Sequence, residues 1–373
     1  MRVVLTGGGT GGHVYPAIAI ARDLQQKVSD VEIMYIGTNK GLESDIVPKE
    51  GLRFATVEVE SLPRKLSLKT LHTAFKLMQG LWGARKLIAA FKPDVVVGTG
   101  GYVCGPVVFI AAMMGIPAVI HEQNALPGIT NKLLSRYAKV VLMTFPESKK
   151  YFPASAKTVL TGLPIRPGIL TVNREQGSRA FGLDPHKFTV LVTGGSRGAR
   201  SLNLAMVETL AAVSKRDDLQ IIMATGTATH QEFMTKVKEA GIDLAAAKHF
   251  VVKPYIYKME EALAAADLCV CRAGAAFLSE LLAKGKPSIL IPYPYAAENH
   301  QEYNARSVVN QGGAILILDK DLDGKRLLAE IEKLAAKPEI MRQMAEKAQA
   351  MGKPEALEQI TAAILTLVNK TAR

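Results

Sequence analysis

Two glycine-rich loops contain the residues whose types and spacing point to chemistry. The first, residues 7–13, follows the apolar run 3–5 and leads into a stretch with helical character. The second, residues 194–199, follows the apolar run 189–192 and leads into another such stretch. Glycines let backbone N–H groups approach oxygens that a Cβ would block, and a helix N-terminus adds the positive end of its dipole. Each loop is therefore predicted to bind phosphate, and the repetition predicts two nucleotide-binding halves.

The first loop also fits the pattern Gly-x-Gly-x-x-Gly, which is typical of dinucleotide-binding proteins. In those proteins an acidic residue at the end of the second strand holds the ribose. Here the predicted second strand, residues 32–36, runs into Gly37, Thr38 and Asn39. The missing carboxylate argues against NAD. Binding of NADP stays open, because Asn39 and Lys40 could face a 2′-phosphate.

The composition indicates two globular domains in a reducing compartment. The chain has 373 residues, of which 48% are hydrophobic, enough for two cores of ordinary size. Its three cysteines show no Cys-x-x-Cys spacing, and Met1 and Arg2 enter a strand with nothing that resembles a signal peptide. Residues 95–120 carry no charge, but glycines and prolines divide them into buried strands around a short helix, so we reject a membrane span.

The net charge of +12 lies mainly in the first half, since residues 1–162 carry +8 and the rest +4. An anionic partner is therefore expected. Aromatic residues are only 6% of the chain, and no recognition helix, zinc finger or RNA-binding motif is present. We expect an anionic membrane surface or a phosphorylated substrate, and no nucleic acid.

Short apolar runs alternate with helical stretches, which predicts an α/β fold with parallel sheets and right-handed crossovers. The runs are residues 3–5, 33–36, 95–97, 118–120 and 140–143, then 189–192, 220–224, 268–271, 288–291 and 314–318. Pro164 and Pro167 mark a link between two domains. We expect one Rossmann-like domain over residues 1–164, a second over 165–350, and a C-terminal helix within 351–373 that packs back on the first.

Five motifs resemble one enzyme family. They are Gly-Gly-Thr-Gly-Gly-His at 8–13, Gly-Gly-Tyr-Val at 100–103, His-Glu-Gln-Asn at 121–124, Gly-Gly-Ser-x-Gly-Ala at 194–199 and Cys-Arg-Ala-Gly at 271–274. In this order they are similar to the MurG family, the inverting N-acetylglucosaminyltransferases of bacterial peptidoglycan synthesis. The resemblance covers nearly the whole chain, and its motifs are far more specific than Gly-x-Gly-x-x-Gly alone.

The resemblance implies the GT-B fold, with two doubly wound Rossmann-like domains whose parallel sheets face a shared cleft. It implies transfer of N-acetylglucosamine from UDP-GlcNAc to the muramoyl 4-hydroxyl of lipid I, giving lipid II. The first domain would bind the acceptor and an anionic membrane surface, and the second would bind UDP-GlcNAc. The protein would lie peripherally on the cytoplasmic face of the bacterial cell membrane, where protein partners of cell-wall synthesis are also expected.

His13 is the candidate general base. It starts a helix, where the dipole disfavours the imidazolium and leaves a neutral ring that can accept a proton from an attacking sugar hydroxyl. A helix-capping or substrate-orienting histidine is the alternative. His121, at the end of a buried strand, is a second candidate, for which a structural role beside Asn124 is the alternative.

The remaining candidates of the first half follow from the motif positions that the resemblance assigns. Thr10, Gly11, Gly12 and Asn124 are assigned to the donor, and Gly8, Gly9, Tyr102 and His121 to the acceptor side. Amide and phenol groups suit sugar hydroxyls because both donate and accept hydrogen bonds.

Three side chains of the second half are expected at the UDP moiety. Arg166 would pair with phosphate, with an interdomain salt bridge to a carboxylate as the alternative. Ser196 would bind a diphosphate oxygen, or instead cap the next helix. Glu280 is the one carboxylate of the apolar helix 275–283, and the family uses this position for two ribose hydroxyls; pairing with Arg272 is the alternative.

Further donor contacts and departures also follow from the resemblance. Tyr255 and Ile256 match the segment that lines the uracil pocket, while Ala275, Gln301 and Asn304 match other donor contacts. Three positions depart from the family pattern: Cys104 replaces serine, Arg197 replaces glutamine, and Phe277 replaces a threonine. Phe277 removes a hydroxyl group expected at the phosphates.

No metal site and no cofactor are expected. Asp321 and Asp323 form a literal Asp-x-Asp, the motif of metal-dependent transferases, but they lie far along the sequence from both glycine loops. We interpret them as part of a solvated turn. The leaving UDP would then be stabilised by helix dipoles and Arg166.

Residues 62–91 combine apolar residues at helical spacing with basic residues. Such spacing usually indicates core packing, but the only tryptophan and the basic residues favour an outer face that docks on a membrane. The expected membrane patch comprises Leu71, Phe75 and Trp82 with Lys65, Lys69 and Lys76.

Other functions stay open at this point. A GT-B glycolipid glycosyltransferase and a UDP-GlcNAc epimerase are the nearest alternatives. An NADP-dependent oxidoreductase and a non-catalytic nucleotide-binding module belong to other classes, and nucleotide preference and product analysis would separate them.

Overall fold

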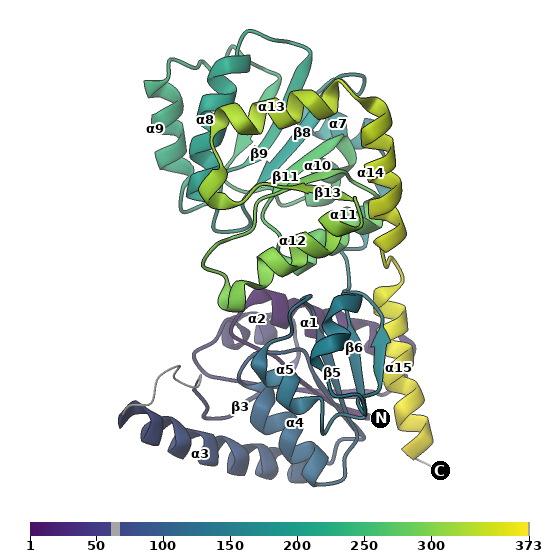
Figure 1. Ribbon diagram of the computed structural model, residues 1–373. Helices are drawn as coiled ribbons and strands as arrows, with labels where there is room; N and C mark the ends of the chain where they lie inside the picture. The colour runs from purple at the N-terminus through teal and green to yellow at the C-terminus, as the bar shows by residue number, and fades with distance from the viewer. Residues whose placement is uncertain (61–67, 372–373) are drawn as a thin grey trace. The chain divides into compact units, whose positions relative to one another are not determined.

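The computed structural model describes residues 1–60 and 68–371, and the side chains of residues 1–60 and 75–369. The chain divides into two compact units, one formed by Met1–Pro164 with Pro354–Arg373 and one by Ile165–Lys353. Each unit contains one parallel sheet with helices on both faces (Figure 1).

The first unit has a sheet of seven strands in the order β3-β2-β1-β4-β5-β6-β7. The strands are β1 (Arg2–Thr6), β2 (Glu32–Gly37), β3 (Arg53–Thr56), β4 (Val95–Gly98), β5 (Ala118–Glu122), β6 (Val140–Met143) and β7 (Thr158–Leu160). The helices are α1 (Gly11–Lys27), α2 (Glu43–Lys49), α3 (Leu68–Phe91), α4 (Cys104–Met113), α5 (Ile129–Leu134), the 3₁₀ helix η1 (Pro146–Tyr151) and α15 (Ala356–Thr371).

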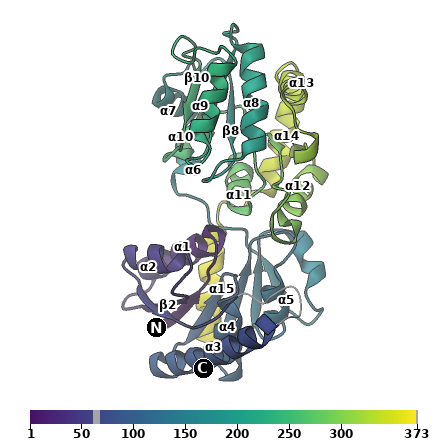
Figure 2. The same cartoon turned by 90° about the vertical axis from the view of Figure 1, so that its left-hand side faces the viewer.

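Alternate side chains of β1 serve two cores. Val3 and Leu5 pack with α1 and with Ile360 and Ile364 of α15, whereas Val4 packs on the other face with α3 and α4. Burial on both faces explains why the central strands are continuous apolar runs. Helix α3 lies along α4 (Figure 2).

The second unit has a sheet of six strands in the order β10-β9-β8-β11-β12-β13. The strands are β8 (Phe188–Thr193), β9 (Leu219–Ala224), β10 (Phe250–Lys253), β11 (Leu268–Cys271), β12 (Ser288–Leu290) and β13 (Ala314–Leu316). The helices are α6 (Gly168–Thr171), α7 (Arg174–Phe181), α8 (Arg200–Val213), α9 (His230–Glu239), α10 (Met259–Ala265), α11 (Ala275–Lys284), α12 (His300–Asn310), α13 (Gly324–Ala335) and α14 (Pro338–Met351), with the 3₁₀ helices η2 (Ala297–Asn299) and η3 (Asp319–Asp321).

Local signals define the helix ends of the second unit. Asn173 and Gln176 form a capping box at the start of α7, and Gly182 ends that helix with φ of 67°. Helix α11 ends in the same way at Gly285, whose φ is 64°. Helices α8, α9 and α13 share one core with β8 and β9.

The ten predicted strands are confirmed, and three strands were missed. The missed strands are β3, β7 and β10, which lie at sheet edges and carry partly exposed residues. Strands β3 and β7 form no apolar run of three residues, whereas β10 has one in Phe250, Val251 and Val252 that was not interpreted as a strand. Cys104 is the first residue of α4.

In both sheets the strand order reverses beside the first strand, between β1 and β4 in one sheet and between β8 and β11 in the other. In doubly wound sheets, ligands bind outside the carboxyl ends of the strands at such a switch point. The loops that follow these four strands are therefore the expected ligand-binding positions of each unit.

Candidate functional site

The loops after β1 and β4 are joined by backbone hydrogen bonds. The N–H of Thr99 donates to the carbonyl of Thr6 at 2.8 Å, and the N–H of Gly8 donates to the carbonyl of Gly100 at 3.2 Å. Gly101 has φ of +85°, and a Cβ at this position would overlap the carbonyl of Gly8. The loops after β1 and β4 thus form one structure, and a residue larger than glycine at position 101 would push them apart.

His13 lies in the first turn of α1 with its ring turned back onto the loop. Its Nδ1 lies 2.8 Å from the carbonyl oxygen of Gly8 and 3.3 Å from Oγ1 of Thr10. Because a carbonyl oxygen only accepts, Nδ1 carries the proton in the neutral ring, and Nε2 is the basic nitrogen. A Cβ on Gly100 would lie 3.0 Å from Nε2, so a glycine there leaves room for the ring.

Glu43, which the sequence analysis did not single out, lies behind the first loop with no exposed surface. Its carboxylate accepts hydrogen bonds from the N–H and Oγ1 of Thr38, at 3.1 and 2.7 Å, and from the N–H of Gly9 at 3.1 Å. The N–H groups of Gly8 and Gly9 therefore have protein partners. An acidic residue in the first turn of a helix is too common a feature to reveal this role from the sequence.

His121 is completely buried, and both of its ring nitrogens have partners. Its Nε2 lies 2.8 Å from the carbonyl oxygen of Gly162, and Nδ1 lies 3.1 Å from Nε2 of Gln123. Burial lowers the pKa of His121 to about 4, so the ring is neutral near pH 7. These contacts favour the structural role over a role in proton transfer.

Glu122 is a second buried carboxylate that sequence reasoning missed. It accepts from the N–H groups of Asn124 and Gly128, at 2.9 and 3.2 Å, and from the side chain of Asn131 at 2.8 Å. Burial raises its pKa, while these hydrogen bonds act in the opposite direction. Glu122 fixes the loop on which Asn124 lies half-buried.

Tyr102 and Cys104 follow the glycine turn after β4. Tyr102 is half-buried, and its ring lies beside Gly9, where a Cβ would be 3.6 Å away. Cys104 is completely buried, with Sγ 3.0 Å from the carbonyl oxygens of Thr6 and Gly100. Burial raises the pKa of this thiol to about 12, so Cys104 is a structural residue and no nucleophile.

The second glycine loop is exposed, in contrast to the first. Ser196 and Arg197 both lie at the surface. The cap residue of α8 is Ala199, with no side-chain hydrogen bond, so the alternative that Ser196 caps this helix is wrong. Gly198 packs against the loop after β9 so closely that a Cβ would overlap the carbonyl of Thr225.

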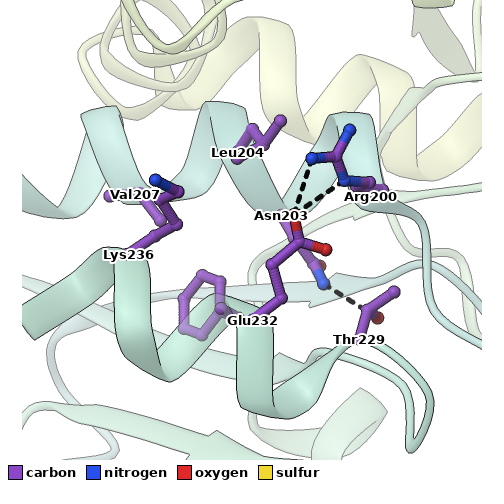
Figure 3. A pocket seen from close by; sticks show the side chains of 8 residues that line it. Arg200, Asn203, Leu204, Val207, Thr229, Glu232 and Lys236 are labelled. Carbon is purple, nitrogen blue, oxygen red and sulfur yellow. Dashed lines mark hydrogen bonds and ion pairs between the residues drawn. The ribbon is translucent and has the colours of Figure 1, made fainter.

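A small groove between α8 and α9 adjoins this loop, and Figure 3 shows its lining. The carboxylate of Glu232 points toward the guanidinium of Arg200 at 2.7 Å, and the amide of Asn203 donates to Oγ1 of Thr229 at 3.1 Å (Figure 3). These contacts hold the starts of α8 and α9 together. No candidate residue from the sequence lies in this groove.

Arg166 and Glu280 form a bidentate ion pair within the second unit. Nε of Arg166 donates to Oε1 of Glu280 at 2.6 Å, and an NH2 group contacts Oε2. The side chain of Glu280 is 7% exposed and that of Arg166 is 43% exposed. Burial disfavours the charge of Arg166, but the carboxylate outweighs burial and raises the pKa of Arg166. The alternative considered for Arg166 was an interdomain salt bridge, which is wrong, because its carboxylate partner lies in the same unit.

Arg272 has a different partner from the one considered above. Its buried guanidinium pairs with Asp319, and it donates to the carbonyl of Ile291 at 3.1 Å and to Oγ of Ser201 at 2.9 Å. The alternative in which Arg272 pairs with Glu280 is wrong. Asp319, just before the Asp-x-Asp sequence, holds this arginine, and Asp323 caps α13 by accepting from the backbone of Arg326.

The other donor candidates of the second unit differ in exposure. Tyr255 is 39% exposed, whereas Ile256 and Ala275 are buried. The amide of Gln301 accepts from the backbone N–H of Tyr293 at 2.9 Å, and the amide of Asn304, fully buried, donates to the carbonyl of Ala273 at 3.2 Å. Phe277 lies half-buried in the first turn of α11.

Comparison with known proteins places both units in one family. The glycosyltransferase family 28 N-terminal domain matches residues 3–143, and the C-terminal domain of that family matches residues 189–360. The chain belongs to glycosyltransferase family 28. The predicted fold class, α/β of the GT-B type with two parallel sheets, is confirmed, as is the resemblance on which it rested.

Relatives of this family-28 chain match it over nearly its full length. It is 53% identical to the UDP-N-acetylglucosamine–N-acetylmuramyl-(pentapeptide) pyrophosphoryl-undecaprenol N-acetylglucosamine transferase of Desulfitobacterium hafniense, over 96% of this chain and 97% of that protein. The protein of the same name from Moorella thermoacetica is 48% identical, over 99% of each chain. The crystal structure of MurG from Acinetobacter baumannii superposes with a TM-score of 0.80 at 28% identity, over 98% of this chain and 99% of that one.

Helix α3 of the family-28 chain carries exposed apolar side chains. Phe75, Met78 and Trp82 are 61%, 65% and 69% exposed, and Lys86 lies over the ring of Trp82 at 5.7 Å. Lys76 is paired with Glu58 at 3.1 Å. Among the other residues of the expected patch, Lys65 lies outside the described residues, and so do the side chains of Lys69 and Leu71.

Two further features bear on metals and membranes. Among the described residues, no group of three His, Cys, Asp or Glu side chains is placed to hold a metal ion. Within the same part of the chain, no helix is both long and apolar enough to cross a bilayer.

Proposed function

We propose that this chain transfers N-acetylglucosamine from UDP-GlcNAc to the 4-hydroxyl of the muramoyl unit of lipid I, giving lipid II. The choice of substrates rests on one observation: over nearly its full length, the chain is 53% and 48% identical to transferases whose names state this donor and this lipid-linked acceptor. The geometry adds a histidine at the start of α1 whose basic nitrogen is Nε2.

The donor is proposed to bind mainly at the switch point of the second unit, Ile165–Lys353. Glu280 accepts the two ribose hydroxyls, Arg166 pairs with the diphosphate, and Ser196 with the backbone amides of its loop binds phosphate oxygens. Each carboxylate oxygen that already accepts from Arg166 keeps a second lone pair for a hydroxyl. The further proposed donor contacts are Tyr255, Ile256, Ala275, Gln301, Asn304, Thr10, Gly11, Gly12 and Asn124.

The first unit is proposed to bind the acceptor and to supply the base. The acceptor oxygen attacks C1 of the donor sugar as the bond from C1 to the β-phosphate oxygen breaks, and the electron pair of that bond leaves with UDP. The proton of the acceptor hydroxyl passes to Nε2 of His13 and then to solvent. Arg166 and the amides of the second loop stabilise the charge on UDP, so the step needs no metal in this proposal.

The exposed apolar side chains of α3 are proposed to hold the enzyme peripherally on the cytoplasmic face of the cell membrane. Phe75, Met78 and Trp82 would enter the acyl boundary, and Lys86 would contact anionic headgroups. This placement brings the first unit to an acceptor that stays in the bilayer.

The test is product analysis with purified protein. Incubation with radiolabelled UDP-GlcNAc and a lipid I analogue should give a labelled disaccharide lipid and one UDP per disaccharide. Without acceptor, the donor should stay intact. Formation of the C2 epimer of the donor would support an epimerase instead, and NADPH binding in the absence of UDP binding would support an oxidoreductase.

A further inference from the structure

One peptide group in the first unit is hydrogen-bonded at both ends to ionisable side chains. The carbonyl of Gly8 and the N–H of Gly9 belong to the same peptide. Its oxygen accepts from Nδ1 of His13 at 2.8 Å, and its N–H donates to Oε2 of Glu43 at 3.1 Å. A buried carboxylate and the candidate base are therefore connected through a single peptide group.

The loop is built around this carboxylate. Glu43 is fully buried, and a Cβ on Gly8 would lie 2.5 Å from its Oε1, while one on Gly41 would overlap the carboxyl group. Neither glycine has a positive φ that would by itself require glycine. The reason for glycine at both positions is therefore the space that the Glu43 carboxyl group occupies. Three donors from Thr38 and Gly9 satisfy the carboxylate, as a buried acidic group requires.

We propose that Glu43 is a positioning residue that acts on His13 through the Gly8–Gly9 peptide. The inference rests on the proposed function, in which His13 takes the acceptor proton. The negative charge of Glu43 polarises the peptide, which makes the oxygen of Gly8 a stronger acceptor for Nδ1–H. That bond fixes the tautomer with Nε2 as the base and stabilises the imidazolium that forms during transfer. No proton passes through the peptide to Glu43.

Other titratable groups that face Glu43 do not change charge over the working range of pH. Tyr35 on β2 donates to the carbonyl of Gly7 at 2.8 Å, and burial raises its pKa well above the usual value. Cys104 on α4 is neutral as well, since burial raises its pKa to about 12. Elsewhere in the first unit, burial lowers the pKa of His121 to about 4, so this ring is also neutral over that range. An acid limb of activity well above pH 4 therefore reports on another group.

The test compares three variants of the full-length enzyme. Glu43→Gln removes the charge with little change of shape, Thr38→Val removes one donor and keeps the charge, and Asp45→Asn removes an exposed carboxylate from the same helix α2. We expect Glu43→Gln to lower kcat by about 10- to 100-fold with KM for UDP-GlcNAc unchanged, and to move the acid limb of the kcat profile to lower pH. Thr38→Val should leave the limb in place, and Asp45→Asn should match wild type throughout.

Two further measurements separate positioning from mere support of the fold. Nitrogen-15 spectra of the histidine rings should show the Nδ1–H tautomer for His13 in wild type and a mixture in Glu43→Gln. In a His13→Ala background, Glu43→Gln should cost no further activity, since the two act as one unit. A wild-type His13 ring with its proton on Nε2 overturns the inference even if Glu43→Gln fails to fold.

The outcomes distinguish this inference from the function on which it rests. If His13→Ala is inactive but Glu43→Gln behaves like Asp45→Asn, the peptide connection is wrong and the base assignment stands. If His13→Ala keeps wild-type turnover, the base assignment itself is wrong, and so is the inference that Glu43 acts on His13 through the Gly8–Gly9 peptide. A fall of kcat in Thr38→Val and Glu43→Gln alike, with no shift of the acid limb, means that Glu43 only supports the loop.

Discussion

Replacement of Glu280 by alanine tests the proposed nucleotide site most directly. The side chain is 7% exposed and its carboxylate already pairs with Arg166 through two contacts. If ribose hydroxyls use the remaining lone pairs, the variant loses two charge-assisted hydrogen bonds to the nucleotide. If the carboxylate only positions Arg166, Glu280→Ala instead weakens the contact between Arg166 and the diphosphate.

The expected magnitude follows from the geometry. Hydrogen bonds to a charged acceptor contribute about 1.5 to 3 kcal/mol each, and water recovers part of this when the acceptor is removed. We therefore expect UDP to bind about 2 kcal/mol more weakly, roughly a 30-fold rise in Kd. The cost in folding stability should stay below the 3–5 kcal/mol of a fully buried broken pair, at roughly 1 to 2 kcal/mol, because Arg166 is 43% exposed and water can solvate it.

The assay is titration calorimetry with UDP, 2′-deoxy-UDP and 3′-deoxy-UDP. Wild type should bind each deoxy nucleotide more weakly than UDP, while Glu280→Ala should bind all three alike. Glu339→Ala, which removes an exposed carboxylate paired with Arg342, is the matched control and should leave every Kd unchanged. Equal binding of UDP and both deoxy nucleotides by wild type would refute the ribose assignment and leave Glu280 as the partner of Arg166 alone.

Three other outcomes are expected. His13→Ala should keep UDP affinity and lose about two to four orders of magnitude in turnover, as for a lost general base; a matching loss of UDP affinity with normal turnover would contradict this. Burial lowers the pKa of His121 from 6.5 to about 4, so its contribution of about 3 kcal/mol to the free energy of unfolding is complete above pH 6.5 and is lost as the pH falls toward 4. The free energy of unfolding of His121→Gln, measured in urea, should therefore depend less on pH than that of wild type between pH 4 and 6.5, and an equal dependence would disprove the assignment. Serine at Phe75 and Trp82 should abolish binding to anionic vesicles and spare transfer to a water-soluble acceptor, whereas unchanged vesicle binding would place the membrane face elsewhere.

The sequence predicted the central strands and the two sheets because both faces of those strands are buried. Residues such as Val3, Val4 and Leu5 must all be apolar when alternate side chains enter two cores. The edge strands β3 and β7 gave no such signal. Strand β7, for example, has no fully buried residue.

Ion pairs were harder to predict than strands, because partners far apart in sequence meet only in the folded chain. Arg272 lies closer in sequence to Glu280 than to Asp319, yet Asp319 is its partner. The sheet explains the difference: Arg272 follows β11 and Asp319 follows β13, so both residues lie at the carboxyl ends of parallel strands of the same sheet. Glu280, a full turn and more into α11, pairs with Arg166 at the start of the unit instead.

The two glycine loops illustrate where sequence similarity stops being informative. Both follow the first strand of a doubly wound sheet and precede a helix, so the same phosphate-binding prediction applied to each. In the structure, the N–H groups of Gly8 and Gly9 are bonded to Gly100 and Glu43, and a buried carboxylate lies behind them. The second loop is exposed and has Arg197 and Arg200 at its end. A phosphate would therefore meet repulsion from Glu43 at the first loop and attraction at the second, which supports the proposal that the acid–base step belongs to the first loop and the diphosphate to the second.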